Sequence, residues 1–478
     1  MSRPQISSPA LVIYSFVALD DEARQGWAYL DRLWTACRAV GPATEPMLGI
    51  TAPENLPDVP SGSGPFRIVA SARRATAGPV RSMFVFTEHG TAGLIAAMSS
   101  DESWDTVVDE WTAAAPETGR SVLGEYTILL GHSPDPQALG PAGAGLARRL
   151  GATAVLPAAS KGPSGSLLWD LPSDNENRHT FIVAAPTTTE TQIDEWVWAT
   201  EGHQGLGKLA RYCLNIARAR HQRRVHEALK PVSELVAETD KVTSALVTHL
   251  STDTAQLLAA DNQVQQLQIA ESGLLWRLTR TQEMTATVRA LLANTRRNRP
   301  TEDGMFARDD AELTWFADQL DREAEYLDAL ARRANAAQTA SANAVTRLLT
   351  RRRERLTLVQ TSILGALLMA LAAIQAFQYT VPMDPVLKGP LTTTLACAAF
   401  GLPFLVARWS GVIPRSESYR WPDLLAALAF GGSLGWLLNT IGWLAHYPAP
   451  LWATLIAVVL GASLLAVPTW RRIRSAAQ

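Results

Sequence analysis

The segment Glu201–Ala210, EGHQGLGKLA, contains the pattern G-x-x-x-x-G-K of a phosphate-binding loop, which ends here at Gly207 and Lys208. Such a loop holds phosphate with backbone amides and places a serine or threonine after the lysine to bind magnesium. Leu209 occupies that position. The apolar residues between 193 and 197 have helical spacing, whereas a phosphate-binding loop follows a strand. We therefore predict a glycine-bearing turn between two helices, with an NTPase as the weaker alternative.

The other segments that resemble catalytic or cofactor-binding motifs do not have the residue spacing that those motifs require. GPSGS at 162–166 is not a G-x-S-x-G nucleophile elbow, because Ser166 occupies its last position. In GPAGAGLARRLG, Arg148 stands where a dinucleotide-binding turn needs glycine or alanine. Cys37, Cys213 and Cys397 lie far apart in the sequence and show no CxxC or Cys/His spacing, which disfavours a disulfide framework or a structural zinc site. We predict no catalytic, cofactor-binding or metal-ligating residue and no cofactor, and we expect that the protein is not an enzyme.

Length and charge set broad limits on the protein. A chain of 478 residues predicts two to four structural units. Its 43 Lys and Arg residues nearly balance its 45 Asp and Glu residues. The most basic stretch, Lys208–Lys230, contains only one aromatic residue among its bases, which does not favour nucleic-acid binding. We expect no nucleic-acid partner.

Four apolar segments near the C-terminus reach roughly the 20 residues that a helix needs to cross a bilayer. They are Leu356–Phe377, Pro390–Ala407, Leu424–Ala445 and Leu451–Pro468, and none contains Asp, Glu or Lys. Four such segments in close succession are unusual for the core of a soluble protein. We therefore predict a four-helix transmembrane domain over 356–470, followed by a cytoplasmic tail at 471–478.

Arginines flank these segments on one side of the predicted membrane. They are Arg351, Arg352, Arg353, Arg355, Arg408, Arg415, Arg420, Arg471, Arg472 and Arg474. Because positive residues stay cytoplasmic, we predict a multi-pass protein of the inner (plasma) membrane, embedded in the lipid bilayer with both termini in the cytoplasm. The segments lack ionisable residues, which disfavours a coupled transporter. In the third segment, Gly431 and Gly435 form a small-xxx-small pair that would let two helices approach closely.

Residues 1–200 combine short β-rich stretches with amphipathic helices. Leu11–Ala18 is typical of a buried strand, and Glu22–Val40 and Ser103–Ala114 are typical of capped helices. The Gly- and Pro-rich passage at 132–166 indicates a loop. We predict an α+β cytoplasmic domain made of two similar small sheets with helices on one face.

Residues 201–355 predict a long antiparallel helical stalk of the coiled-coil type. Apolar residues recur at 4-3 spacing between residues 246 and 292, and again between 313 and 348. Pro300 and Gly304 interrupt the pattern between these two runs. No helix breaker separates the second run from the first apolar segment, so we expect one arm of the stalk to continue into the membrane.

The two arms carry opposite charge. Lys208–Lys230 has seven Lys or Arg residues against one acid, Glu227, and Asp309–Asp328 has eight acids against one base, Arg322. Solvated faces are the usual explanation of such runs. The alternatives are that the two helices pair with each other, or that the basic helix binds anionic lipid or an acidic partner.

Two segments resemble a known family. They are LVIYSFVALDDEARQGWAYLDRLWTACRAV at Leu11–Val40 and DEWVWATEGHQGLGKLARYCLNIARARHQRRV at Asp194–Val225. Together with the order of an α/β region, a coiled coil and apolar segments, they resemble the bacterial CATRA (caspase and TPR-repeat associated) family. The resemblance implies a component of bacterial biological-conflict systems that acts beside caspase-like peptidases and TPR-containing proteins. It supplies no catalytic residues.

The same order of elements also resembles CorA-type magnesium channels. That family has a Gly-Met-Asn signature after its pore helix. The corresponding stretch here is QYTVPMDPVLKGP at 378–390, which lacks the signature, and four apolar segments follow the stalk instead of two. A CorA-like ion channel or transporter is therefore the alternative hypothesis.

The sequence as a whole predicts a non-enzymatic membrane component of a bacterial conflict or defence system. Its cytoplasmic domain would receive a caspase-like peptidase or a TPR-containing protein and act through the stalk on a membrane anchor or a pore. We expect a homo-oligomer. If a peptidase activates the protein, the segments Gly140–Gly165 and Arg296–Arg308 are the predicted cleavage sites.

Overall fold

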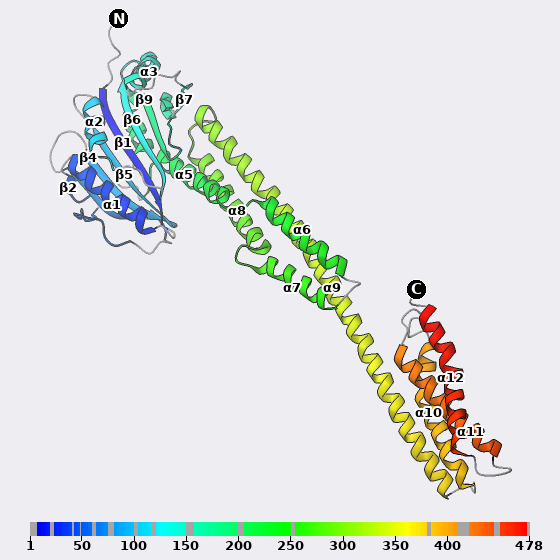
Figure 1. Ribbon diagram of the computed structural model, residues 1–478. Helices are drawn as coiled ribbons and strands as arrows, with labels where there is room; N and C mark the ends of the chain where they lie inside the picture. The colour runs from blue at the N-terminus through cyan, green and yellow to red at the C-terminus, as the bar shows by residue number, and fades with distance from the viewer. Residues whose placement is uncertain are drawn as a thin grey trace. The chain divides into compact units, whose positions relative to one another are not determined.

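The computed structural model divides the chain into two compact units (Figure 1). One comprises Met1–His249 and Leu258–Ala337, and the other comprises Leu250–Leu257 and Gln338–Gln478. The described residues are 7–19, 23–40, 43–47, 49–59, 64–74, 81–99, 104–116, 121–149, 157–171, 173–198, 205–249, 254–379, 384–409, 420–443 and 450–475.

The first unit is built on one nine-stranded sheet with the order β2-β3-β4-β5-β1-β6-β9-β8-β7 among the described residues. Neighbouring strands pair antiparallel except β6 and β9, which are parallel. The strands are β1 (Ser7–Ala18), β2 (Ala43–Glu45), β3 (Arg67–Arg74), β4 (Arg81–Glu88), β5 (Thr91–Ser99), β6 (Val122–Ser133), β7 (Ser160–Lys161), β8 (Leu167–Leu171) and β9 (Arg178–Pro186). Our expectation of two small sheets is wrong, because β6 and β9 join the two halves edge to edge.

The central strand β1 explains why both faces of the sheet are covered. Leu11 and Ile13 lie in one apolar cluster, whereas Tyr14 and Phe16 lie in another, and all four are fully buried. A strand that is apolar on both faces needs helices on both sides. The α+β class is therefore confirmed, but the expectation of helices on a single face is wrong.

The helices divide between the two faces of the sheet (Figure 1). Helices α1 (Ala23–Val40), α2 (Trp104–Ala114) and α3 (Leu139–Arg149) cover one face. Helices α4 (Glu190–Val197) and α5 (Lys208–Glu227) cover the other. Short 3-10 turns occur at Pro136–Ala138, Pro163–Gly165 and Thr187–Thr189.

Helix α3 lies within the passage that we expected to be a loop. Leu139, Leu146 and Ala147 share one face of this helix and are buried in the same cluster as Trp169. Gly143 faces the Trp169 ring, and its lack of a side chain lets the helix approach β8 closely. Gly143 therefore serves the packing of α3 against β8.

Gly143→Ala is expected to destabilise the first unit by about 1–3 kcal/mol, because the new methyl group would overpack the core. A Cβ at position 143 would lie 2.4 Å from Cζ3 of Trp169. Gly145 is the matched control, because nothing lies within 4 Å of a Cβ at that position of the same helix. Thermal midpoints of the two full-length alanine variants in detergent check this prediction, and equal midpoints would contradict it.

After α5 the chain continues as α6 (Val232–His249), α7 (Thr254–Ile269), α8 (Leu274–Asn298) and α9 (Gly304–Tyr379). The first predicted arm is broken at Gly273, whose extended backbone caps the start of α8. A Cβ there would lie 2.5 Å from the carbonyl oxygen of Leu267, so the tight connection requires glycine. The predicted break near Pro300 and Gly304 is confirmed.

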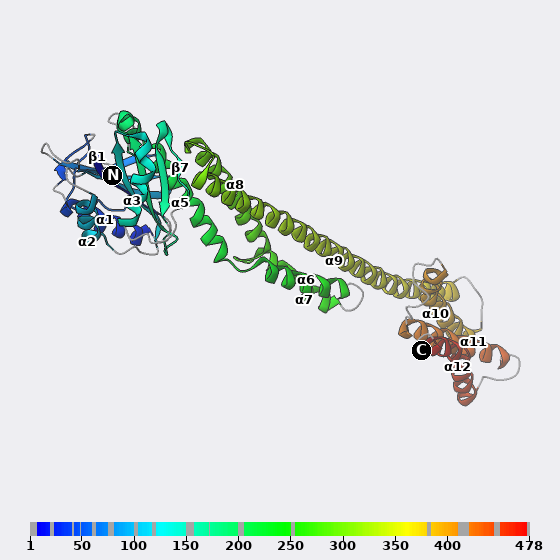
Figure 2. The ribbon, with the colours of Figure 1, turned by 90° about the horizontal axis from the view of Figure 1, so that it is seen from above.

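Helices α8 and α9 pack together along an apolar seam that includes Val288, Ala317 and Leu320 of the predicted 4-3 frame (Figure 2). One buried cluster contains Met284, Val288, Phe316, Ala317 and Leu320. A second cluster adds α6 to the pair and contains Leu235, Leu274, Leu327, Leu330 and Ala331. Long helices with a coiled-coil type of seam thus follow the sheet, as predicted.

The second unit contains the later part of α9 together with α10 (Pro385–Trp409), α11 (Arg420–Trp443) and α12 (Leu451–Ser475). Within the described residues, two segments are long and apolar enough to cross a membrane, namely Gln360–Phe377 and Leu424–Trp443. Leu451–Val467 is a shorter apolar helix. The side chains of 403–407 in the second predicted span, and of Pro468 in the fourth, lie outside the described part. The structure therefore gives two candidate spans where we predicted four.

Helices α11 and α12 approach each other at glycines. A Cβ at Gly435 would lie 2.2 Å from the carbonyl oxygen of Ala457, and one at Gly431 would lie 2.4 Å from that of Gly461. The close approach predicted for the small-xxx-small pair is confirmed.

Gly435→Ala is expected to destabilise the packing of α11 on α12 by about 1–3 kcal/mol, because the added carbon meets backbone that cannot rotate away. Gly442→Ala is the matched control on the same helix, since nothing lies within 4 Å of its Cβ position. Tryptophan fluorescence during heating of the detergent-solubilised chain measures both variants. If Gly442→Ala unfolds at as low a temperature as Gly435→Ala, the close contact of Gly435 with α12 is not what stabilises this helix pair.

Candidate functional site

Helix α5 lies between the sheet and helix α8. At Gly124 of β6, a Cβ would lie 2.9 Å from the Cβ of Ala217, so the helix rests directly on the strand. The buried residues of α5 are Leu209, Ala210, Tyr212, Cys213, Leu214, Asn215, Ile216, Ala217 and Ala219. Contacts from the sheet and from the long helices therefore meet on α5.

The basic residues of α5 pair with the acidic first part of α9. Arg223 forms an ion pair with Glu312. His226 Nε2 lies 2.9 Å from Glu323 Oε2. Of the alternatives weighed for the two charge runs, the pairing of the helices with each other is observed. The solvated-face explanation is wrong for Arg220 and Arg223, because both pair with acids of α9.

Asp309 of α9 is buried at the centre of this contact, with 4% of its surface exposed. The Tyr212 hydroxyl donates to its Oδ2 at 2.6 Å, and Arg220 Nη2 lies 3.4 Å from its Oδ1. Burial raises the pKa of Asp309, while the Arg220 charge and the Tyr212 hydrogen bond oppose that rise. A buried carboxylate of this kind depends on its partners to stay ionised.

The same contacts reach the sheet through Arg220. Arg220 donates to Nε2 of His179 on β9, and His179 Nδ1 lies 3.8 Å from Oδ1 of Asp170 on β8. Asp170 in turn accepts from Arg308 of α9 at 2.5 Å. The Tyr126 ring on β6 stacks on His179 with ring centroids 5.1 Å apart. The sheet, α5 and α9 are thus joined by polar contacts.

We call this set the Asp309 network, and its members are Asp170, His179, Tyr212, Arg220, Arg308 and Asp309. Burial alone would raise the pKa of Asp170. The contacts with His179 and Arg308 outweigh burial and lower this pKa overall. The network therefore contains two carboxyl groups with opposite tendencies. The surroundings of Asp170 favour its ionised form, whereas burial disfavours the ionised form of Asp309.

A second charged contact fastens α9 further along its length. Glu323 accepts a hydrogen bond of 2.8 Å from Arg277 of α8 and also contacts His226 of α5. The Arg277 side chain is only 6% exposed. Burial would raise the pKa of Glu323, but His226 and Arg277 lower it overall. Glu323 therefore ties α9 to both neighbouring helices.

The loop between α8 and α9 is fastened to β7. The Met305 N–H donates to Ser160 Oγ at 2.8 Å, and the Thr301 hydroxyl donates to the carbonyl oxygen of Lys161 at 2.9 Å. Gly304 begins α9 with φ +54°, and a Cβ there would lie 2.1 Å from Ser160 Oγ. The start of α9 is therefore docked on the sheet by its backbone as well as by its charges.

Both predicted cleavage segments include helical residues as well as loop residues. Only residues 299–303 of Arg296–Arg308 lie between helices α8 and α9. Gly140–Gly165 includes most of α3, and its residues 150–156 lie outside the described part of the chain. Cleavage between α8 and α9 would require prior release of the loop from β7.

The segment that resembles a phosphate-binding loop lies at the joint before α5. Residues 201–204 lie outside the described part, and Gly207 caps α5. A Cβ at Gly207 would lie 2.4 Å from the carbonyl oxygen of Trp198. The described elements on either side of the joint are helices α4 and α5, so the prediction that two helices flank it is confirmed.

The described residues contain no group of three His, Cys, Asp or Glu placed to hold a metal ion. Cys213 lies beside the Asp309 network, but burial raises the pKa of its thiol, and burial also raises the pKa of Cys37 to about 12. Buried thiols with raised pKa values are poor nucleophiles. What the arrangement offers is a buried polar link between the sheet and the long helix.

Spacing in the sequence could not identify this network. Asp170 and His179 lie on separate strands, and Arg220 is one base within a longer basic run. The only signal was the opposite charge of the two helical runs, and it pointed to a pairing of helices without saying which residues are buried.

Comparison with solved structures gives a weak match. The CorA magnesium transporter from Methanocaldococcus jannaschii matches with a TM-score of 0.29 and 12% sequence identity, over 62% of this chain and 94% of that chain. A likeness at this level carries no argument about fold or function. No curated protein matches the chain.

Two family models match adjoining parts of the chain. The CASPASE and TPR Repeat-Associated N-terminal domain matches residues 10–201, which hold the sheet, and the corresponding C-terminal domain matches residues 207–334. The division falls at the glycine joint before α5, and the Asp309 network draws residues from both matched domains. The chain therefore belongs to the CATRA family of caspase and TPR repeat-associated proteins.

Proposed function

We propose that this CATRA protein is a non-enzymatic membrane component of a bacterial conflict system. The two matched domains receive a caspase-like peptidase or a TPR-containing protein, and helix α9 links them to an anchor or a pore in the membrane. The family match supports the class of partner. The apolar helices support the membrane location.

The observation that carries the membrane part of the proposal is the exposed apolar surface of Gln360–Phe377. Only 11% of this segment is buried, whereas the core helix of a soluble protein is mostly buried. Leu364, Leu368 and Leu371 are 58%, 63% and 57% exposed. A continuous exposed apolar surface of this kind is suited to lipid and not to water.

Helix α9 supports the coupling role because it is one helix from Gly304 to Tyr379. Its first turns contain Asp309, and its later residues contain the apolar segment Gln360–Phe377. Helices switch by small shifts or rotations against their neighbours. A partner that disturbs the Asp309 network would therefore act on the same helix that enters the bilayer.

The topology is also part of the proposal. The arginines that flank the apolar segments support an inner-membrane protein with both matched domains in the cytoplasm. Hydrogen bonds between the apolar helices support their assembly, since Thr394 Oγ1 donates to the Ser433 carbonyl at 3.1 Å and Asn439 Nδ2 donates to Thr454 Oγ1 at 3.4 Å. We propose that several copies assemble through these helices.

Co-expression of the full-length chain with a caspase-like peptidase and a TPR-containing protein from the same organism tests this function. We expect a complex that survives purification from membranes, and a partner-dependent change in the permeability of vesicles that contain the chain. The absence of any complex, together with unchanged permeability, would contradict the proposal. Ion flux in vesicles that contain the chain alone would instead indicate a constitutive ion channel.

A further inference from the structure

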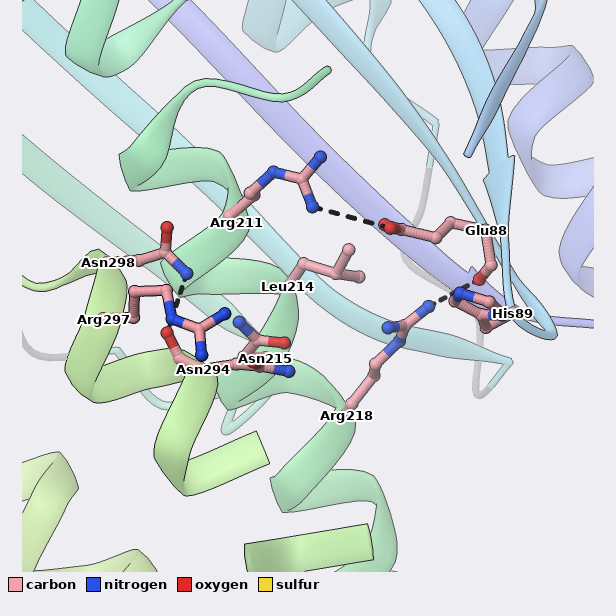
Figure 3. Close-up of a pocket in the computed structure, with 9 residues that line it drawn as sticks. All are labelled: Glu88, His89, Arg211, Leu214, Asn215, Arg218, Asn294, Arg297 and Asn298. Carbon is pink, nitrogen blue, oxygen red and sulfur yellow. Dashed lines mark hydrogen bonds and ion pairs between the residues drawn. The ribbon is translucent and has the colours of Figure 1, made fainter. Parts of the chain in front are cut away.

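A cavity of about 430 Å³ lies in the first unit between the β4–β5 turn, helix α5 and the end of α8 (Figure 3). Its volume falls in the range of sites for small organic molecules, roughly 300–1,000 Å³. It is considerably larger than a single phosphate ion needs. The cavity shares no residue with the Asp309 network.

Three arginines line this cavity against one carboxylate. Arg211 and Arg218 come from α5 and Arg297 comes from α8, while Glu88 is the acid. Figure 3 shows Arg211 and Arg218 directed towards Glu88, with Arg297 on the α8 side of the same space. With three guanidinium groups and one carboxylate, the lining has an excess of positive charge.

Arg218 is held in place mainly by uncharged acceptors. Its Nε donates to Thr91 Oγ1 at 3.0 Å, and its Nη2 donates to the carbonyl oxygen of Glu88 at 2.5 Å. The Glu88 carboxylate lies 3.5 Å from Arg211 instead. Burial lowers the pKa of Arg218; Glu88 opposes that shift and Arg211 adds to it. A bound anion would add to the single carboxylate, Glu88, that now favours the charged form of Arg218.

The remaining lining residues are suited to polar recognition. Asn215 is 7% exposed, and Asn294 and Asn298 extend the lining along the last turns of α8. The Asn298 side-chain amide donates to the backbone carbonyl oxygen of Asn294 at 2.7 Å, which holds the Asn298 side chain at the cavity. Arg297 forms no ion pair with any residue that the structure describes. Guanidinium donors can bind the anionic group of a ligand, and the neighbouring amide groups can bind its polar organic part.

We propose that this cavity binds a small phosphate-bearing molecule of about nucleotide size. Guanidinium forks match the geometry of phosphate oxygens, and the asparagines face the space that a sugar or a base would fill. Glu88 belongs to the N-terminal matched domain, whereas the arginines and asparagines belong to the C-terminal one. The ligand therefore joins the two domains. This inference stands independently of the proposed membrane function.

Isothermal titration of the full-length chain in detergent with inorganic pyrophosphate, ADP and adenosine tests the site. We expect saturable binding of pyrophosphate and ADP, and none of adenosine. Arg297→Gln should weaken ADP binding at least about tenfold, because it removes a charge-assisted contact. Arg297 is exposed, so the variant should fold normally. Asn294→Asp, also at an exposed position, should abolish binding by adding a negative charge.

Arg280→Gln is the matched control, because Arg280 is an arginine of the same helix that lies outside the cavity, with 41% of its side chain exposed. It should bind ADP as the wild type does. The proposal is overturned if neither pyrophosphate nor ADP saturates the protein below about 10 mM, a range that includes weak metabolite sites. It is also overturned if Arg280→Gln weakens binding as much as Arg297→Gln, or if pyrophosphate binds and ADP does not.

Discussion

Arg220→Ala is expected to lower the free energy of unfolding of the first unit by about 3–5 kcal/mol at neutral pH, because it leaves a buried carboxylate without its cation. Asp309 is 4% exposed, and Arg220 Nη2 forms an ion pair with its Oδ1 at 3.4 Å. Arg220 also donates to His179, so the variant loses the link to the sheet. Hydrogen exchange of the backbone amides in α5 and in the first turns of α9 measures the loss in the full-length chain.

The loss should shrink in acid, and the direction follows from the pKa of Asp309. Burial raises this pKa in the folded state, and Arg220 opposes the rise. Without Arg220 the folded-state pKa rises further, so folding favours the protonated form. The contribution of a raised carboxyl pKa is fully present below the unfolded value of about 3.9 and is lost as pH rises through the folded value. The difference between wild type and Arg220→Ala should therefore be largest at neutral pH.

Two further variants separate this effect from general damage. Arg322→Ala changes an exposed arginine of α9 and should alter stability by less than about 0.5 kcal/mol. The double variant Arg220→Met with Asp309→Leu should recover at least half of the loss, because it removes both buried charges. A loss in Arg220→Ala that does not change with pH would show that Asp309 is not the source.

Gly304→Ala is expected to cost about 2–4 kcal/mol, since it combines a strained backbone with a clash. Gly304 has φ +54°, and its Cβ would lie 2.1 Å from Ser160 Oγ. The substitution should detach the start of α9 from β7, so that the glutamate-specific protease Glu-C cuts after Glu302, in the loop between α8 and α9, faster than in the wild type. Limited proteolysis followed by mass mapping measures this release.

Gly49→Ala is the matched control for the cost of placing alanine at a positive φ without a steric clash. Gly49 has φ +70°, but nothing lies within 4 Å of its Cβ position. It should cost only about 1 kcal/mol and leave the rate of cleavage after Glu302 unchanged. If both variants release the loop equally, the contact of Gly304 with Ser160 does not hold α9 in place.

The sequence predicted the classes of element well because hydrophobic periodicity is local. The apolar run at Leu11–Ala18 became β1, and the 4-3 spacing around Leu313, Ala317 and Leu320 became the buried side of α9. The helix pair at Gly431 and Gly435 was likewise predictable, because small residues four apart leave a groove for a neighbouring helix.

What the sequence could not predict depends on contacts between distant elements. Parallel pairing of β6 with β9 merges the expected two sheets into one, and neither strand encodes that choice. A local rule interprets the glycines of α3 as a loop, whereas Gly143 is required by the packing of this helix against Trp169, which lies on a distant strand. The enclosure of Arg220 and Asp309 follows from the position of α5 between the sheet and α8. Burial of a charge cannot be inferred from the charge run that contains it.

In the proposed function, helix α9 leaves the matched domains and enters a lipid bilayer. Single cysteines placed along α9 in vesicles and treated with a membrane-impermeant maleimide test it most directly. Leu364→Cys, Leu368→Cys and Leu371→Cys probe residues that a single chain leaves exposed, so protection there requires lipid or a second copy packed within the bilayer. Ala336→Cys and Ala342→Cys are matched exposed positions earlier in the same helix. The account predicts full labelling at 336 and 342 and protection at 364, 368 and 371 until detergent is added, whereas equal labelling at all five positions would contradict it.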